Sequence, residues 1–354
     1  MKKVFIIMMI GIIAVSCRNS SDHNNGPLET LMLKENIRDT LSADKVFRSV
    51  DYITLDVPDS VLMGYPSKII RDGNKILISD GTKIFVFEKD GRYIRSVSRL
   101  GRGPGEHRGI RDFTADGNNI YMVDSNPKLL KYSVDGKFIE DLPLGSFAAT
   151  VQPLGNGNLV VTSAYQANEA KFKLFDESTL KEVSSYCPVD EAEMKYRQII
   201  GQNNFFRYKG FLLFHEKWNS DVYKLGNDGY SILYHIDFFG KNIPSAFLHD
   251  HYSDVIDFSM KLNGKGYSYL LNDYAESAEN ILMKIMDNGK VYMCLYNKRT
   301  KASTLFRYMK MQKGVPAVDV KTMPANFYSE DSMFLTLKEN EKNLKVRICQ
   351  VKLR

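Results

Sequence analysis

The sequence predicts an all-β fold built from repeats of a four-stranded sheet, and three observations support this class. A pattern of Asp-Gly-Asn, a short apolar run and a second Asp-Gly begins at Asp72 and again at Asp116, 44 residues later. Runs rich in β-branched and aromatic residues stand between Asp-Gly and Asn-Gly pairs, as tight hairpins require. The 20 Tyr and 20 Phe residues supply bulky side chains that fill the space between stacked sheets.

A repeat of about 40–45 residues is typical of one four-stranded blade of a β-propeller. Weaker copies begin near residues 153, 205, 286 and 329. The last copy has too few strands, and residues 46–58 provide a spare strand at the other end of the chain. Pairing of the two ends would close the ring and remove its exposed edges. We therefore expect a six-bladed β-propeller over residues 46–354, closed by N- and C-terminal strands.

One segment, residues 241–285, interrupts the repeat. Apolar positions around Val255 to Leu262 recur at spacings of three and four, which indicates a helix rather than a strand. We expect a short helical insertion between the fourth and fifth blades. It would serve either as a lid over one end of the ring or as a packed addition at its outer edge.

The first 16 residues predict a lipoprotein signal peptide. Lys2 and Lys3 precede an apolar run that is too short to span a bilayer as a transmembrane helix. The small residues before Cys17 resemble a bacterial lipobox, in which that cysteine is lipidated and carries palmitate-type chains. An ordinary cleaved signal is the alternative. Residues 17–45 follow as an expected flexible tether, because they begin as a polar stretch without apolar periodicity.

Arg18 follows the cysteine and no acidic run comes after it, so we expect an outer-membrane lipoprotein that faces the periplasm. The formal net charge of +6 is mild and, with export, argues against a nucleic-acid partner. The remaining cysteines are Cys187, Cys294 and Cys349, which are widely spaced without a C-x-x-C pair. Neither a disulfide framework nor a zinc site is predicted, and no metal or cofactor is expected.

The stretch RLGRGPGEHRGIRDF, residues 99–113, is the main candidate for a binding loop. It lacks the spacing of a phosphate-binding motif. Arg102, Arg108 and Arg111 would place positive charge where connections between blades converge, which suits a carboxylate, sulfate or phosphate. Solvation or pairing with nearby carboxylates is the alternative for these arginines. Glu106 is either a base or, as we favour, an acceptor for backbone amides of its own loop.

A second candidate lies in the sequence FHEKW, where His215 and Trp218 end a predicted strand. They would form an aromatic platform for a sugar ring, or they would pack between blades, which is the commoner environment of such a tryptophan.

The repeat resembles that of NHL-type six-bladed β-propellers. The matching positions are Gly101, Gly103, Gly105, Glu106, Asp116-Gly117-Asn118, Ile120 to Asp124, Asn126, Leu129 to Tyr132 and Asp135-Gly136. The sequence departs from the family at His107, Arg108 and Gly109, where an aromatic residue and a proline are frequent. As a whole, the chain resembles the membrane-anchored bacterial propeller lipoproteins of the NHL-repeat or TolB-like type.

Our leading hypothesis is a non-catalytic envelope lipoprotein whose propeller binds a ligand, anionic or carbohydrate, or another envelope protein at one face. The alternative is a metal-dependent lactonase, lyase or hydrolase with its site in the central channel. A structural spacer is a third possibility. The sequence has no G-x-S-x-G elbow and no Cys–His arrangement of a known kind, so no catalytic residue is assigned.

Overall fold

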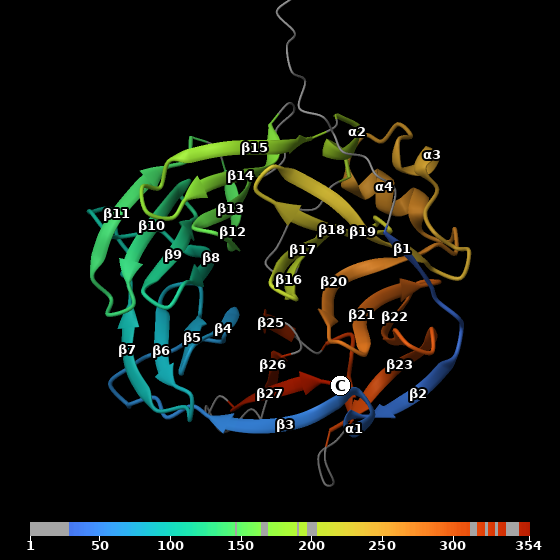
Figure 1. Ribbon diagram of the computed structural model, residues 1–354, viewed down its shortest axis with the longest axis horizontal. Coiled ribbons are helices and arrows are strands. Elements are labelled where there is room, and N and C mark those ends of the chain that lie inside the picture. Colours follow the sequence, from blue (N-terminus) through green and yellow to red (C-terminus); the bar gives the residue numbers. More distant parts are fainter. Residues whose placement is uncertain are drawn as a thin grey trace, which may run out of the picture.

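The structure is a computed structural model of the 354-residue chain, and it describes residues 28–145, 147–163, 169–189, 191–196, 204–311, 317–322, 325–329, 332–337 and 347–354. Six sheets lie within these residues. Figure 1 shows the sheets side by side around a common axis, with the first strand of each nearest the centre. The chain is therefore an all-β propeller with few helices.

Five of the sheets each take four consecutive strands of the chain. In order they are β4 (Lys68–Asp72), β5 (Lys75–Ser79), β6 (Ile84–Glu88) and β7 (Tyr93–Val97); β8 (Ile110–Ala115), β9 (Asn119–Asp124), β10 (Lys128–Ser133) and β11 (Phe138–Pro143); β12 (Ala148–Gly155), β13 (Asn158–Ser163), β14 (Ala170–Asp176) and β15 (Glu182–Pro188); β16 (Phe205–Tyr208), β17 (Phe211–His215), β18 (Asp221–Gly226) and β19 (Gly229–Asp237); and β20 (Ser268–Glu276), β21 (Asn280–Asp287), β22 (Lys290–Asn297) and β23 (Ala302–Lys310). A short strand, β24 (Val318–Asp319), pairs with β23.

The sixth sheet combines both ends of the chain. It consists of β25 (Ala325–Ser329), β26 (Ser332–Leu337), β27 (Arg347–Leu353) and the N-terminal strand β3 (Phe47–Thr54). β27 and β3 pair antiparallel from Arg347 opposite Thr54 to Leu353 opposite Phe47. The expected pairing of the two ends is thus confirmed, and the sixth sheet packs against the first through a shared apolar cluster that includes Ile348, Phe334 and Ile69.

The N-terminal segment differs from the flexible tether expected over residues 17–45. β1 (Glu29–Met32) adds in parallel to β19, and β2 (Ile37–Ser42) adds in parallel to β23, before α1 (Ala43–Val46) leads into β3. Leu31 and Leu41 are buried there. The segment is ordered because the outer strands of two sheets offer unpaired backbone groups that an extended chain satisfies. Residues 1–27, with the predicted signal peptide, lie outside the described residues.

The expected helical insertion is present but shorter than residues 241–285. It contains α3 (Ser245–Leu248) and α4 (Val255–Leu262), whereas β20 already begins at Ser268. The pairing of β20 with β21 shifts register between Leu270 and Tyr274. This irregularity disturbs the alternation of apolar residues that would have identified β20 as a strand. A further short helix, α2 (Glu191–Met194), lies between the third and fourth sheets.

Two kinds of connection meet at one face of the ring, which we call the crossover face. Neighbouring strands of each four-stranded unit are antiparallel, so the turn from second to third strand and the crossover from fourth strand to the next sheet lie at the same end. Hydrogen bonds join the two kinds: Ile110 N donates to Gly81 O at 2.8 Å, and Ser125 N donates to Gly109 O at 2.8 Å. The insertion with α3 and α4 is itself the crossover from the fourth to the fifth sheet.

The seam between the sixth and first sheets should contribute strongly to stability. We expect Ile348→Ala to lower the free energy of unfolding by about 2–5 kcal/mol, because this fully buried side chain fills the seam and its loss leaves a cavity. Lys352→Ala, in the same strand but only half-buried, should change it by less than about 0.5 kcal/mol. Urea unfolding of both variants measures the difference, and equal effects would contradict a packed seam.

Candidate functional site

Four of the sheets carry a carboxylate where their second strand ends at the crossover face. These residues are Asp80, Asp124, Glu216 and Asp287. The Asp80 carboxylate accepts a hydrogen bond from Gly64 N at 3.0 Å, and Asp124 accepts from Arg108 N and Gly109 N at 2.9 and 3.2 Å. Asp287 accepts from Ser268 Oγ, at the start of β20, at 2.6 Å and lies 3.5 Å from Lys241 Nζ of the crossover. At these three positions the carboxylate therefore holds the incoming crossover in place.

Glu216 occupies the same position in the fourth sheet but has a different contact. Its Oε2 lies 3.4 Å from Lys171 Nζ, an ammonium that comes from β14 of the third sheet. Lys171 Nζ also lies 3.3 Å from Glu193 Oε2, on α2. The contact thus crosses from one sheet to the next, and the lysine stands between two carboxylates.

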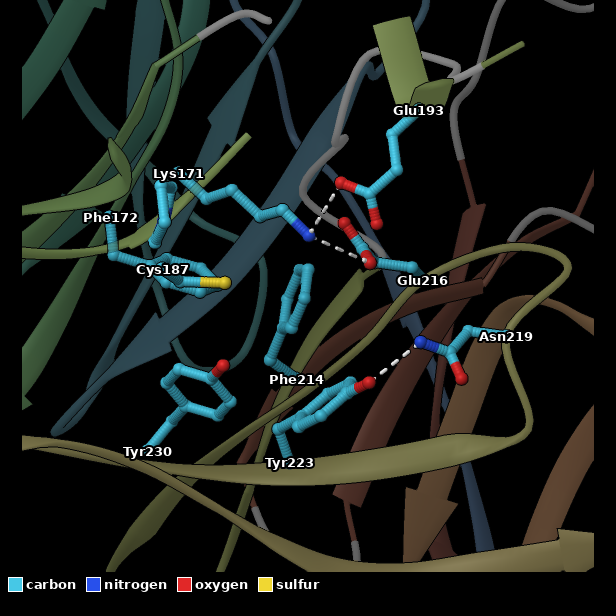
Figure 2. Close-up of a pocket in the computed structure, with 10 residues that line it drawn as sticks. Lys171, Phe172, Cys187, Glu193, Phe214, Glu216, Asn219, Tyr223 and Tyr230 are labelled. Carbon is cyan, nitrogen blue, oxygen red and sulfur yellow. Dashed lines mark hydrogen bonds and ion pairs between the residues drawn. The ribbon is translucent and has the colours of Figure 1, made fainter. Parts of the chain in front are cut away.

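A cavity of about 210 Å³ lies beside this lysine, between the third and fourth sheets, and we call it the Lys171 pocket. Figure 2 shows Lys171 reaching between Glu193 and Glu216 on one side, with Tyr223 and Tyr230 on the other. The lining residues are Lys171, Phe172, Cys187, Pro188, Glu193, Phe214, Glu216, Asn219, Tyr223 and Tyr230. Several of them, such as Pro188 and Tyr230, are at least partly exposed, so solvent reaches the pocket.

The charged groups of the pocket are largely removed from water. The side chains of Lys171 and Glu216 are 8% and 9% exposed, and that of Glu193 is 20% exposed. Ion pairs in such surroundings are screened by salt less than surface pairs are. Removal of one partner would leave the opposite charge buried without compensation. Burial, followed by the charges of Glu216 and Asp221, raises the pKa of the Tyr223 hydroxyl well above its usual value of 10.0. That hydroxyl is therefore neutral at physiological pH.

Aromatic rings form the other walls of the pocket. Phe172 and Phe214 meet edge to face with centroids 4.9 Å apart, and Tyr223 and Tyr230 do so at 5.7 Å. Asn219 Nδ2 donates a hydrogen bond to the Tyr223 hydroxyl at 2.7 Å. These contacts fix the rings before any ligand arrives.

The helical insertion packs against the turn that carries part of this pocket. Trp218 follows Glu216 in the turn after β17, and its ring packs against Phe258 of α4 and Tyr196, which follows α2. The same apolar cluster contains Tyr252 and Ile243. The insertion therefore braces the turn that presents Glu216 and Asn219 to the pocket.

The sequence candidates His215 and Trp218 are both core residues of the crossover face. The His215 ring is fully buried about 6 Å from the rings of Phe206 and Tyr274. Trp218 is 4% exposed. Of the two alternatives for these residues, an open aromatic platform and packing in the interior, the structure shows interior packing, and α4 covers the indole.

The glycine-rich loop forms the crossover from β7 to β8, as expected. Glu106 Oε2 accepts hydrogen bonds from Arg102 N at 3.0 Å and Gly103 N at 2.9 Å, and its Oε1 lies 2.9 Å from Arg99 Nη2. A Cβ on Gly101 would lie 2.0 Å from the same carboxylate, so a larger residue at that position would displace the Glu106 side chain. Glu106 is thus an acceptor within its own loop.

The three candidate arginines of this loop, Arg102, Arg108 and Arg111, are exposed on the crossover face. The Arg111 guanidinium stacks 3.8 Å from the centroid of the Phe147 ring. Within the part of the chain that the structure describes, none of the three forms an ion pair, whereas Arg99 pairs with Glu106. The arginines lie at the boundary of the first and second sheets, apart in the chain from the Lys171 pocket.

The remaining sequence predictions concern anchoring and metals. Cys17 lies outside the described residues. Among the described residues, no group of three or more His, Cys, Asp and Glu side chains is arranged to hold a metal ion. The described helices include none with the length and apolar character needed to cross a membrane.

Sequence reasoning missed the residues of the Lys171 pocket. Lys171, Glu193 and Tyr230 come from different elements, and no local motif joins them. One signal was available: FLLFHE aligns with KILISD and NIYMVD of the first two sheets, so Glu216 stands where the repeat has aspartate. A longer acid at a repeated structural position indicates a different partner.

The chain is similar to a family of proteins and to several solved structures. The model of the family described as Domain of unknown function (DUF4934) matches residues 28–347. No curated protein matches the sequence. A crystal structure of a candidate exported protein from Bacteroides fragilis NCTC 9343 is similar, with a TM-score of 0.71 and 18% identity over 92% of this chain and 99% of that chain. At this identity the likeness concerns the fold alone.

Two eukaryotic β-propeller structures are also similar, at lower scores. They are the β-propeller domain of Cps50 (Swd1) from Myceliophteria thermophila, with a TM-score of 0.44 and 11% identity over 86% of this chain and 100% of that chain, and the Pan2 WD40 domain from Neurospora crassa, with a TM-score of 0.42 and 10% identity over 80% and 74%.

The Glu106 contacts predict a pH dependence. The N–H of Gly103, with the Arg99 charge and the N–H of Arg102, holds the pKa of Glu106 below its usual value of 4.5. A carboxylate with a lowered folded-state pKa stabilises the fold above pH 4.5, and that contribution disappears as the pH falls through the folded-state pKa. Glu106→Gln should therefore be less stable than wild type at pH 7, with a difference that shrinks on acidification.

Urea unfolding between pH 7 and pH 3 measures this, with Glu182→Gln, an exposed carboxylate on β15, as the matched control. A difference for Glu106→Gln that stays constant over the whole range would show that the charge of Glu106 does not hold the loop.

Proposed function

The chain belongs to the DUF4934 family, and from that premise we propose that it is an exported, non-catalytic envelope protein that binds a ligand through its crossover face. The Lys171 pocket carries this proposal. Ligand sites in proteins are concave, have mostly apolar walls with a few fixed polar groups, and occur where structural units meet. The pocket has these properties at the junction of the third and fourth sheets.

The exposed arginines provide a second feature of the same face. Arg102, Arg108 and Arg111 suit an acidic group on a ligand or on an envelope protein, since guanidinium groups bind carboxylates and phosphates in bidentate fashion. Because they are exposed, they would contribute to attraction and orientation more than to affinity.

The proposal includes an anchor at Cys17 and an envelope location, in the outer membrane and facing the periplasm. The residues before Cys17 support lipidation, and the similar fold of a candidate exported protein is in keeping with export. The proposal also takes the six sheets as six blades of an NHL-repeat or TolB-like propeller. The support for this is the repeated pattern that begins at Asp72 and again at Asp116.

Anchoring is tested by one substitution. Cys17→Ser should move the protein from the membrane fraction to the soluble fraction and abolish labelling by a palmitate analogue, because the thiol that receives the lipid is gone. Cys187→Ser should leave both unchanged. Membrane association and labelling that survive Cys17→Ser would rule out this anchor.

Binding is tested by blocking the pocket. In a full-length Cys17→Ser background, N-ethylmaleimide should modify Cys187, because Cys294 and Cys349 are fully buried. Figure 2 shows the Cys187 sulfur directed into the pocket, so the adduct fills it. We expect ligands from a panel of sugars, organic acids, amines and short peptides to raise the melting temperature of the unmodified protein and to lose that effect after alkylation.

The variant with Arg102→Ala and Arg108→Ala separates the two features of the face. This double substitution should weaken the binding of acidic ligands only, whereas alkylation should weaken the binding of every ligand of the pocket. Ligand-induced shifts that persist in full after alkylation would contradict binding at the Lys171 pocket.

A further inference from the structure

The geometry of the Lys171 pocket points to a ligand class, and we propose that it binds a single neutral sugar ring, such as the terminal residue of an envelope glycan. This inference rests on the proposed binding function and assigns its ligand. It follows from the size of the cavity, the mixture of its polar groups, the placement of its rings and the signs of its charges.

The size of the pocket limits the ligand to one small ring. At about 210 Å³, it lies below the roughly 300–1,000 Å³ of pockets that hold drug-sized molecules. It exceeds by several-fold the roughly 30 Å³ that one water molecule occupies in the liquid. A nucleotide or an oligosaccharide is too large to enter fully, whereas one pyranose ring is of suitable size.

The polar groups of the pocket match a polyhydroxylated ligand. Each sugar hydroxyl both donates and accepts hydrogen bonds, so a site for it needs donors and acceptors together. The carboxylates of Glu193 and Glu216 accept, the ammonium of Lys171 donates, and the Asn219 amide supplies both. Because Lys171 already lies between the two carboxylates, these groups are fixed in direction before binding.

The aromatic walls match the other character of a sugar. A pyranose presents C–H groups on its faces and hydroxyls around its edge, so it packs on an aromatic ring while its edge forms hydrogen bonds. Tyr223 and Tyr230 stand opposite the charged group, as Figure 2 shows, and Phe214 lies between. A ring that lies against the tyrosines would direct its hydroxyls towards Lys171 and the glutamates.

The charges of the pocket argue against ionic ligands. Among the described lining residues, two carboxylates oppose one ammonium, so an anionic ligand would meet like charge in a poorly hydrated site. An ammonium ligand would have to displace Lys171 from the position it already holds between Glu193 and Glu216. A neutral polar ring avoids both costs.

The test uses probes that share one ring and differ in charge. Full-length protein with Cys17→Ser is exposed to N-ethylmaleimide, and the rate of Cys187 alkylation is followed by mass spectrometry. The probes are methyl glycosides of glucose, galactose, mannose and N-acetylglucosamine, with glucuronate as the anionic analogue, glucosamine as the cationic analogue and glycerol as the polyol without a ring. We expect at least one neutral glycoside to slow alkylation about tenfold at saturation, and its charged analogues and glycerol to do so much less.

Variants then identify the contacts. Glu216→Gln and Tyr230→Ala should each raise the dissociation constant of the protecting glycoside about tenfold or more, whereas Glu182→Gln, exposed on β15, should leave it unchanged. Circular dichroism and urea unfolding establish that each variant is folded. Since Glu216 contacts buried Lys171, Tyr230→Ala at the partly exposed rim keeps the test valid if Glu216→Gln proves unstable.

The possible results separate this inference from the function on which it rests. Protection by glucuronate, glucosamine, an organic acid or a peptide, with none from the neutral glycosides, would overturn the sugar assignment and leave ligand binding intact. Equal protection by glycerol would also overturn it. Absence of protection by every probe, together with absence of melting-temperature shifts, would overturn both.

Discussion

The antiparallel pairing of β27 with β3 is the constraint on which the rest of the structure depends. Through it the C-terminal sheet is completed by a strand that comes directly before the first sheet in the chain, so the ring has no open end. Ring closure fixes each sheet between two neighbours, and the first and last sheets then bury Ile348 and Phe334 against Ile69. The path to β3 also explains the two parallel strands β1 and β2, which the chain forms as it passes the outer edges of the fourth and fifth sheets.

Because the sheets repeat, a departure at one repeated position is informative. Asp80 and Asp124 use their carboxylates to bind backbone N–H groups of the crossover, a role that needs a short acid close to the main chain. Glu216 at the same place extends to Lys171 of the preceding sheet. Glutamate is longer than aspartate by one methylene. At this position the aspartates contact the neighbouring crossover, whereas the glutamate contacts the preceding sheet. A cavity with fixed polar groups results, while the strands that carry it remain those of an ordinary repeat.

The sequence predicts those parts of the fold whose causes are local. The spacing of Asp72 and Asp116 reveals the repeat because tight turns need particular residues, and the helical period at Val255 to Leu262 coincides with α4. Glu106 was predicted as an acceptor in its own loop because its amide partners are its near neighbours.

Features that depend on distant partners could not be predicted in this way. The extended conformation of residues 29–42 depends on pairing with the outer strands β19 and β23, which lie more than 190 residues further along the chain. For Trp218 the sequence leaves an open platform and packing between blades as alternatives, and only the fold shows that its ring packs against α4. The Lys171 pocket requires Lys171 and Glu216 to be adjacent, and only the stacking of neighbouring sheets brings them together.

The crossover face thus combines two environments with different physical roles. Arg102 and Arg108 are exposed, where salt screens charges over about 8–10 Å, so under the proposed function their effect on a ligand would be one of attraction and orientation. Lys171 and Glu216 are buried, where hydrogen bonds are stronger and an unmatched polar group is costly. Under the proposed function, discrimination between ligands would therefore reside in the pocket, because a ligand that fails to replace the lost hydration of these groups would be rejected there. The insertion contributes by holding Trp218, and with it the turn of Glu216, against α4.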